Sequence, residues 1–370
     1  MKLNTYFKKI AATLLITLTL LIGCTNTQES TSTVSVSEDS KKIAILATTP
    51  MLGEFVKQVG TDNIDLRVLI PYGADPHHYE PSPQDVTKIT EADLIFYVGL
   101  KYEPSSLNKL LINSSSDSQV LVEIGPKINP IEFGHDDHDE HDDDHKDKDH
   151  DDEDEHDDDH KDKDHDDEDE HDDDHKDKDH DDEDEHDDDH KGHDHGAFDP
   201  HFWFDPNRVA LAVDAIKEEL IKLDPENKNA YEEAANNYLE KLKALDQEIA
   251  ALIESIPSNN RGIVTTHESL GYLEDRYGLE VIATVIPSLT TEDGVTPKGL
   301  VEVIEEIKEH GIKVIFIESE SPTQSSEIVA KEANARLVSG LWVETLKENQ
   351  SYIDFLKTNI NLIAENLKEQ

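Results

Sequence analysis

Three histidines in candidate loops could bind a metal ion together. His77 lies in the segment DPHHYEPSPQDV after the apolar run 64–70, and His201 lies in DPHFWFDP. His267 directly follows the apolar run GIVTT at 262–266. Neutral imidazole is the commonest side-chain ligand for zinc, and three imidazoles with a carboxylate or a water complete a tetrahedron. Any one of them could be an ordinary loop histidine, but the three together favour a metal site.

The segment 135–195 offers a second and different set of metal ligands. It holds 15 of the chain's 20 histidines and repeats the unit HDDDHKDKDHDDEDE from His141, His156 and His171, with a truncated copy from His186. It contains 38 acidic residues, 7 lysines and no apolar side chain, so we predict a disordered, solvated insertion in a surface loop. Imidazoles among carboxylates favour capture of zinc, nickel or copper, whereas calcium binding and an acidic spacer are alternatives.

The tract ends six residues before His201, so it could collect metal at low affinity and raise the local concentration beside the predicted site. The histidines assigned to this auxiliary metal-binding loop are His141, His145, His150, His156, His160, His165, His171, His175, His180, His186, His190, His193 and His195.

The strongly acidic composition makes nucleic acid an improbable class of partner. The formal net charge is −51, and the chain outside the tract still carries −20. Phosphate backbones are bound by basic patches, which this sequence lacks. The 286 residues that remain without the leader and the tract are enough for two domains.

The first 23 residues are typical of a lipoprotein signal peptide. Three lysines precede a short apolar run at 10–22, which favours an export signal over a membrane-spanning helix. The ending Leu-Ile-Gly-Cys is similar to a lipobox, so Cys24, the only cysteine, is expected to carry a lipid anchor to the membrane. Residues 24–41 are rich in Ser and Thr and are expected to form a flexible tether. The alternative is a chance cysteine after an ordinary signal peptide.

Short apolar runs alternate with helical patterns on both sides of the tract. Strands are expected at 43–49, 64–70, 94–100, 120–124, 262–266, 281–286, 314–318 and 335–341, with helices between them and after the last strand. This alternation predicts mostly parallel sheets covered by helices on both faces. The loops beyond the carboxyl ends of such strands are the usual place for a ligand site.

A long helix is predicted between the two halves. Asp205-Pro206 opens one helix, and Asp224-Pro225 opens another whose apolar residues are spaced by threes and fours until Pro257. We therefore predict an α/β protein of two doubly wound, parallel-sheet lobes joined by a long rigid helix, with the metal site in the cleft between them. The expected boundaries are 42–205 for the N-terminal lobe with its insertion, 206–257 for the linking helices and 258–370 for the C-terminal lobe.

The histidine segments DPHHYEPSPQDV, DPHFWFDP and TTHESLGYLEDRYGL resemble the ligand segments of the metal-specific substrate-binding proteins of ABC transporters. The segment TTEDGVTPKGLVEVIEEIKEHGIKVIFIES is similar to that family's second-lobe stretch, and the resemblance covers residues 42–368 apart from the tract. The family includes zinc-uptake and manganese-uptake receptors, and its streptococcal members were first described as adhesins. It has two α/β lobes bridged by a rigid helix.

Carried over residue by residue, this resemblance implies that His77, His201 and His267 are metal ligands and that a carboxylate before the last helix is the fourth. The segment SGLWVETL places Glu344 there, although the family's usual Asp-centred motif is not reproduced. A histidine at 267, where manganese receptors of the family have glutamate, implies zinc.

Other candidates for the fourth ligand remain open at this point. A water, or the carboxylate of Glu80, Glu268 or Glu318, could take the place given to Glu344.

The resemblance implies an extracytoplasmic, lipid-anchored receptor that captures Zn²⁺ with high affinity and delivers it to a membrane permease driven by an ATPase. We expect no chemical turnover, because the chain has no HExxH motif and a closed four-ligand site leaves no open position for a substrate. The alternatives are a receptor for manganese or another divalent metal, and a surface adhesin or metal-buffering lipoprotein whose tract is the active part.

Overall fold

The computed structural model describes residues 42–116, 118–133 and 198–368. The predicted leader, the lipidation site Cys24, the tether and the histidines of the tract lie outside the described residues. Among the described residues, no helix is long and apolar enough to cross a membrane.

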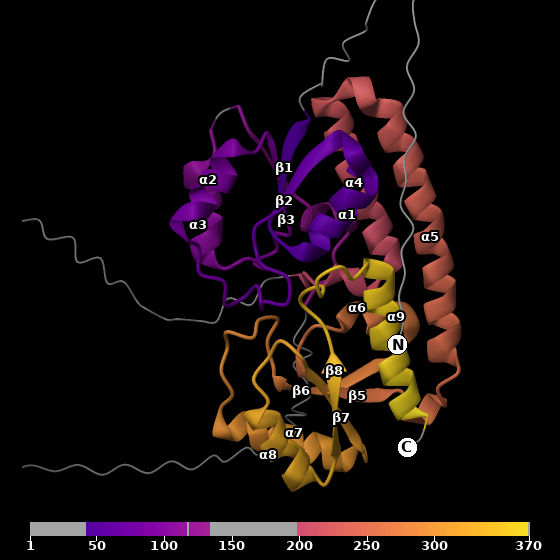
Figure 1. Ribbon diagram of the computed structural model, residues 1–370. Helices are drawn as coiled ribbons and strands as arrows, with labels where there is room; N and C mark the ends of the chain where they lie inside the picture. The colour runs from indigo at the N-terminus through magenta and orange to yellow at the C-terminus, as the bar shows by residue number, and fades with distance from the viewer. Residues whose placement is uncertain (1–41, 117, 134–197, 369–370) are drawn as a thin grey trace, which may run out of the picture. The chain divides into compact units, whose positions relative to one another are not determined.

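Two parallel four-stranded sheets form the two lobes (Figure 1). The first contains β1 (Ile43–Ala47), β2 (Ile64–Val68), β3 (Leu94–Tyr97) and β4 (Val120–Glu123) in the order β2-β1-β3-β4. The second contains β5 (Gly262–His267), β6 (Glu280–Ile286), β7 (Val314–Glu318) and β8 (Arg336–Leu341) in the order β6-β5-β7-β8. This order is doubly wound in each lobe, which confirms the predicted fold class.

Helices cover both faces of each sheet (Figure 1). They are α1 (Pro50–Gly60), α2 (Pro83–Glu91), α3 (Ser105–Ser114), α4 (Pro206–Leu223), α5 (Lys228–Glu254), α6 (Gly271–Tyr277), α7 (Pro297–Glu309), α8 (Gln324–Ala333) and α9 (Tyr352–Leu367). Four of them begin at a Ser, Thr or Asp cap followed by proline, a pairing that satisfies free N–H groups and fixes the first helical φ. These starts were therefore predictable from the sequence.

The long helix α5 runs past both sheets and packs against helices of both lobes, namely α1 and α4 of the first and α6 and α9 of the second (Figure 1). Its 27 residues span about 40 Å. The sequence predicted that this helix would begin at Pro225, but it begins at Lys228. The Asp224 carboxylate accepts hydrogen bonds from Asn227 and Tyr231, which holds residues 225–227 in a separate 3-10 turn.

One apolar core joins the lobes. It contains Phe55 of α1, Leu245 of α5, Phe316 of β7 and Phe355 of α9, all buried. The lobe boundaries expected at residues 205 and 258 remain a prediction, because this core has members on both sides of them.

The loops at the carboxyl ends of the two sheets meet each other. Gly73, in the loop after β2, donates its N–H to the carbonyl of Leu346, which lies after β8. Thr291, in the loop after β6, donates its hydroxyl to Asp75 Oδ2 at 2.7 Å. The strand predicted at 94–100 also ends early, at Tyr97, because residues 99–101 adopt positive φ and turn the chain toward this region.

Candidate metal centre

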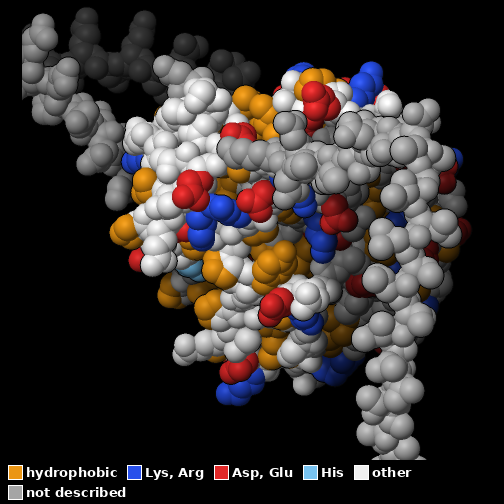
Figure 2. Space-filling model, turned by 45° about the horizontal axis from the view of Figure 1, so that its top comes forward, with side chains coloured by type: hydrophobic (Ala, Val, Ile, Leu, Met, Phe, Trp, Pro, Cys, Tyr) orange, Lys and Arg blue, Asp and Glu red, His pale blue; other side chains and the backbone are white. Residues whose placement is uncertain are grey.

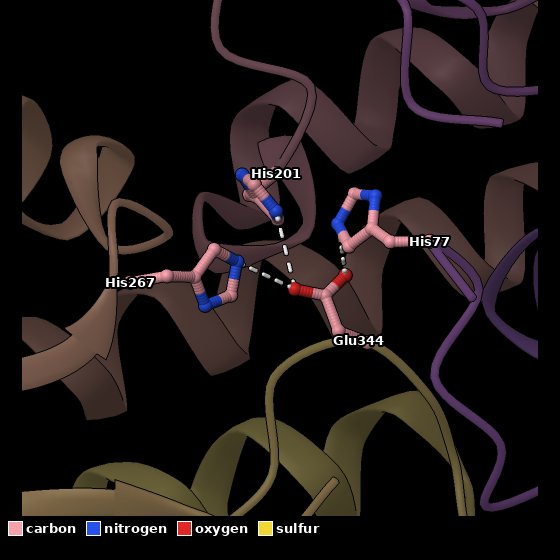
Figure 3. A group of neighbouring side chains, drawn as sticks. All are labelled: His77, His201, His267 and Glu344. Atoms are coloured by element: carbon pink, nitrogen blue, oxygen red, sulfur yellow. Dashed lines mark ion pairs between the residues drawn. The ribbon is translucent and has the colours of Figure 1, made fainter. Parts of the chain in front are cut away.

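Four buried side chains converge where these loops meet (Figure 3). His77 comes from the loop between β2 and α2, and His201 lies just before α4. His267 ends β5, and Glu344 lies between β8 and α9. Each offers one potential ligand atom, and these atoms all lie within 4.8 Å of one another. The sequence-predicted ligand candidates are thus brought together from both lobes.

Four atoms that face one another in this cluster have no partner with hydrogen-bond geometry among the described residues. Glu344 Oε1 lies 2.8 Å from His267 Nε2 and 3.3 Å from His201 Nε2, while Oε2 lies 3.6 Å from His77 Nε2. None of the three Nε2 atoms, nor Oε1, makes a contact with hydrogen-bond geometry to any described group. Buried polar atoms are nearly always paired, so four orphaned atoms at one point indicate a ligand-binding site. Three nitrogens and one carboxylate oxygen suit a divalent cation.

Two carboxylates behind the rings orient the imidazoles. Asp199 Oδ1 lies 2.8 Å from His201 Nδ1, and Glu318 Oε2 lies 2.7 Å from His267 Nδ1. A proton on each Nδ1 leaves the opposite nitrogen, Nε2, with its lone pair directed at the centre of the cluster. Carboxylate–histidine pairs of this kind are a regular feature of metal sites.

The Asp-Pro-His tripeptide has a structural explanation. Asp75 Oδ1 accepts the backbone N–H of His77 at 2.9 Å, and Asp199 Oδ1 accepts that of His201 at 2.8 Å. In both loops the aspartate closes a tight turn that presents the histidine two residues later. The positioning role of Asp199 was not predicted, although its place two residues before a candidate ligand was visible in the sequence.

The other carboxylates considered for the fourth ligand do not lie among the three Nε2 atoms. Glu80 is exposed, and Glu268 accepts the hydroxyl of Thr284 at 2.8 Å. Glu318 bonds the ring and the backbone N–H of His267 from behind. Only Glu344 lies among the three Nε2 atoms, which makes it the candidate for the fourth ligand.

Glu344 is held by groups that sequence reasoning missed. Tyr102, in the loop after β3, donates its hydroxyl to Glu344 Oε2 at 2.9 Å and to the Glu344 carbonyl at 3.0 Å. Burial, with the Glu344 charge, raises the pKa of Tyr102 well above its usual value, so the hydroxyl keeps its proton and donates. Glu320 Oε1 accepts the backbone N–H groups of Val343 and Glu344. These contacts fix the carboxylate in place.

The indole of Trp203 closes the site on one side. Its ring lies against His201 and Tyr102, with centroids 5.5 Å and 5.2 Å away. Its Nε1–H donates to the Val343 carbonyl at 2.9 Å.

On the face shown in Figure 2, acidic and basic side chains are interspersed and very little histidine is visible, which fits the burial of the three site histidines.

Burial and the neighbouring charges act in opposite directions on the pKa values of this cluster. Burial would lower the pKa of His201, but the Glu344 and Asp199 carboxylates raise it to about 9. Burial likewise disfavours a charge on His267, but Glu318 and Glu344 hold its pKa well above the usual value. Burial would raise the pKa of Glu344, yet His201 and His77 keep it well below its usual value. Without metal, protons on His201 and His267 balance the Glu344 carboxylate, and an arriving cation must displace them.

Comparison with known proteins identifies the family. The profile of the periplasmic zinc-uptake complex component A matches residues 45–366. The metal ABC transporter substrate-binding lipoprotein FimA of Streptococcus parasanguinis is 27% identical over 370 residues, covering 98% of this chain and 100% of the relative. The manganese ABC transporter substrate-binding lipoprotein PsaA of Streptococcus pneumoniae is 26% identical, with 98% and 100% covered. The iron ABC transporter substrate-binding lipoprotein MtsA of Streptococcus pyogenes serotype M1 is also 26% identical, with 94% of each chain covered.

Solved structures share the fold. The periplasmic zinc-binding protein TroA from Treponema pallidum superposes with a TM-score of 0.67 at 21% identity, covering 88% of this chain and 99% of that one. A manganese-bound periplasmic metal-binding protein from candidatus Liberibacter asiaticus gives 0.66 at 22%, with 88% and 100% covered. The names of these relatives specify zinc, manganese or iron, so similarity does not identify the metal. The chain belongs to the family of the periplasmic zinc-uptake complex component A, whose members are extracytoplasmic metal-binding receptors of ABC transporters and not enzymes.

Proposed function

We propose that this receptor captures Zn²⁺ with His77, His201, His267 and Glu344 and delivers it to an ABC-type permease driven by its ATPase. The observation that carries the proposal is the cluster of four buried, orphaned ligand atoms, three of them imidazole Nε2. The delivery step follows from the family. All four side chains are buried, which suits a bound cation.

The donor set supports zinc over manganese. Zinc is a borderline-soft cation that takes nitrogen ligands and is usually four-coordinate and tetrahedral. Manganese favours carboxylate, carbonyl and water oxygens in an octahedral arrangement. Three nitrogens and one carboxylate atom therefore suit zinc better. Nickel and copper also bind imidazole, so they are the relevant competitors by ligand type.

A competition titration tests the choice of metal. The full chain is loaded with manganese in large molar excess and then given zinc in steps up to one equivalent, so that the tightest site fills first. We expect zinc to occupy one site per chain and to displace manganese from it. If manganese kept the site against zinc, the proposed cargo would be wrong.

Removing the carboxylates behind the rings should weaken zinc binding without removing a ligand. Asp199→Asn or Glu318→Gln keeps the shape of the side chain but loses the charge that orients each imidazole and raises its basicity. We expect the zinc affinity to fall about 10–100-fold, the usual cost of losing such a partner. Isothermal or chelator-competition titration measures the change.

The matched control is Asp224→Asn, at the start of the 3-10 turn before α5. Asp224 also accepts side-chain hydrogen bonds, from Asn227 and Tyr231, but takes no part in the cluster. The zinc affinity of the Asp224→Asn variant should match that of the unmodified chain. Equal losses in all three variants would mean that stability, and not ring orientation, causes the effect.

We also propose that Cys24 carries a lipid anchor to the membrane and that the tract 135–195 collects metal for the site. The lipobox-like segment and the spacing of the tract's histidines support these roles, and several relatives are named lipoproteins. A Cys24→Ser variant that stayed in the membrane fraction would contradict the anchor.

A further inference from the structure

The two oxygens of Glu344 have different surroundings. Oε2 accepts a hydrogen bond from the Tyr102 hydroxyl at 2.9 Å. Oε1 has no hydrogen-bond partner among the described residues and lies nearest to the Nε2 atoms of His267 and His201. The carboxylate thus presents one oxygen that is already engaged and one whose lone pairs face the histidines.

Tyr102 is fixed in this position from several sides. Its side chain is 1% exposed, and its ring lies against His77 and Trp203, with centroids 5.0 Å and 5.2 Å away. Its hydroxyl donates to the Glu344 carbonyl as well as to Oε2, so it contacts both the backbone and the side chain of that residue. The packing of the ring therefore keeps the hydroxyl beside these two acceptors of Glu344.

We propose that Tyr102 determines metal specificity by restricting Glu344 to a single donor oxygen. The inference rests on the proposed function, because it assumes that the four residues bind the cargo. With Oε2 bonded to the hydroxyl, Glu344 contributes Oε1 only, and the described residues offer four donors in all. A carboxylate that gave both oxygens to the metal would compete with the hydroxyl for Oε2 and weaken this charge-assisted hydrogen bond, leaving the hydroxyl with the Glu344 carbonyl alone.

Coordination number separates the candidate metals. Four donors complete the preferred shell of zinc but leave manganese short of the six that it favours. The Tyr102 and Trp203 rings and the three imidazoles surround the site, and the phenol oxygen of Tyr102 already bonds Glu344. The Tyr102 hydroxyl therefore weakens the binding of manganese more than the binding of zinc. Removing it should narrow the difference in affinity between the two metals.

The substitution Tyr102→Phe tests this role because it removes the hydroxyl and keeps the ring. In the full chain, given less than one equivalent of metal, we expect the zinc affinity to change only a few-fold. Manganese should bind more tightly, so that the ratio of zinc to manganese affinity falls about tenfold, in line with the strength of one hydrogen bond to a charged group. The control is Tyr231→Phe, which removes a hydroxyl that bonds the Asp224 carboxylate near the start of α5. It should leave the ratio unchanged.

X-ray absorption on the zinc-loaded unmodified chain gives a second readout that does not depend on any variant. Four nitrogen or oxygen donors are expected, and five or more would overturn the inference. An unchanged affinity ratio in a folded Tyr102→Phe protein, with circular dichroism and thermal unfolding as folding checks, would overturn it too. If the unmodified chain failed to bind one zinc in preference to manganese, the proposed function would fail first and the inference with it.

Discussion

Replacing His201 with alanine will weaken zinc binding about 10²–10³-fold. Structural zinc sites of four protein ligands contribute about 10–16 kcal/mol of binding free energy, or roughly 2.5–4 kcal/mol for each ligand. Each 1.4 kcal/mol is tenfold in affinity. His201 is the ring best placed to show this, because it is fully buried, contacts Trp203 and is oriented by Asp199. Its loss also leaves the buried Asp199 carboxylate without its imidazole partner.

Chelator-competition titration measures this change. His310→Ala is the control, because His310 is exposed at the end of α7 and bonds only neighbouring Glu306 among described residues. The control should bind zinc as the unmodified chain does. If His201→Ala kept its affinity within a few-fold, the cluster at the lobe junction would not be the zinc site.

Zinc at about a thousandfold its dissociation constant should stabilise the folded protein by about 4 kcal/mol. The four ligand atoms come from segments between residues 77 and 344, and only the folded chain brings them together. Zinc therefore binds the native state in preference to the unfolded one. For a protein of this size, about 2–4 °C per kcal/mol predicts a rise in the melting temperature on the order of 10 °C.

Thermal unfolding with zinc and with a chelator measures the shift. His201→Ala is the decisive comparison, because it retains the histidines of the tract and loses one ligand of the proposed site. We expect most of the stabilisation to disappear in this variant. An equal shift in both proteins would mean that zinc acts through other residues.

Much of the fold could be predicted because local patterns determine it. The eight strands are short apolar runs, and four helix starts carry a capping residue with a proline. The predicted ends of two elements were wrong, because a side-chain contact or a backbone turn within a few residues moved them. The Asp224 carboxylate delays the long helix to Lys228, and positive φ at residues 99–101 ends β3 early.

The candidate site could be predicted only in part. The histidines were singled out by residue type and by their place after strands, and the structure brings them together with Glu344. Asp199 lies two residues from His201 and was within reach of sequence reasoning, but Tyr102 and Glu318 were missed as orienting groups because their contacts join distant segments. Tyr102 and Glu344 are 242 residues apart, and His267 and Glu318 are 51 apart. No local pattern encodes such a pair, so Glu318 was considered as a ligand when it supports one.

The most direct measurement is zinc titration of the chain without residues 135–195, with and without His201→Ala. The four proposed ligands lie outside that segment, so the shortened chain should bind one zinc with the same high affinity as the full chain. Adding His201→Ala should abolish this tight binding. Loss of tight one-to-one binding on removing 135–195 alone, from a chain that remains folded, would contradict the account.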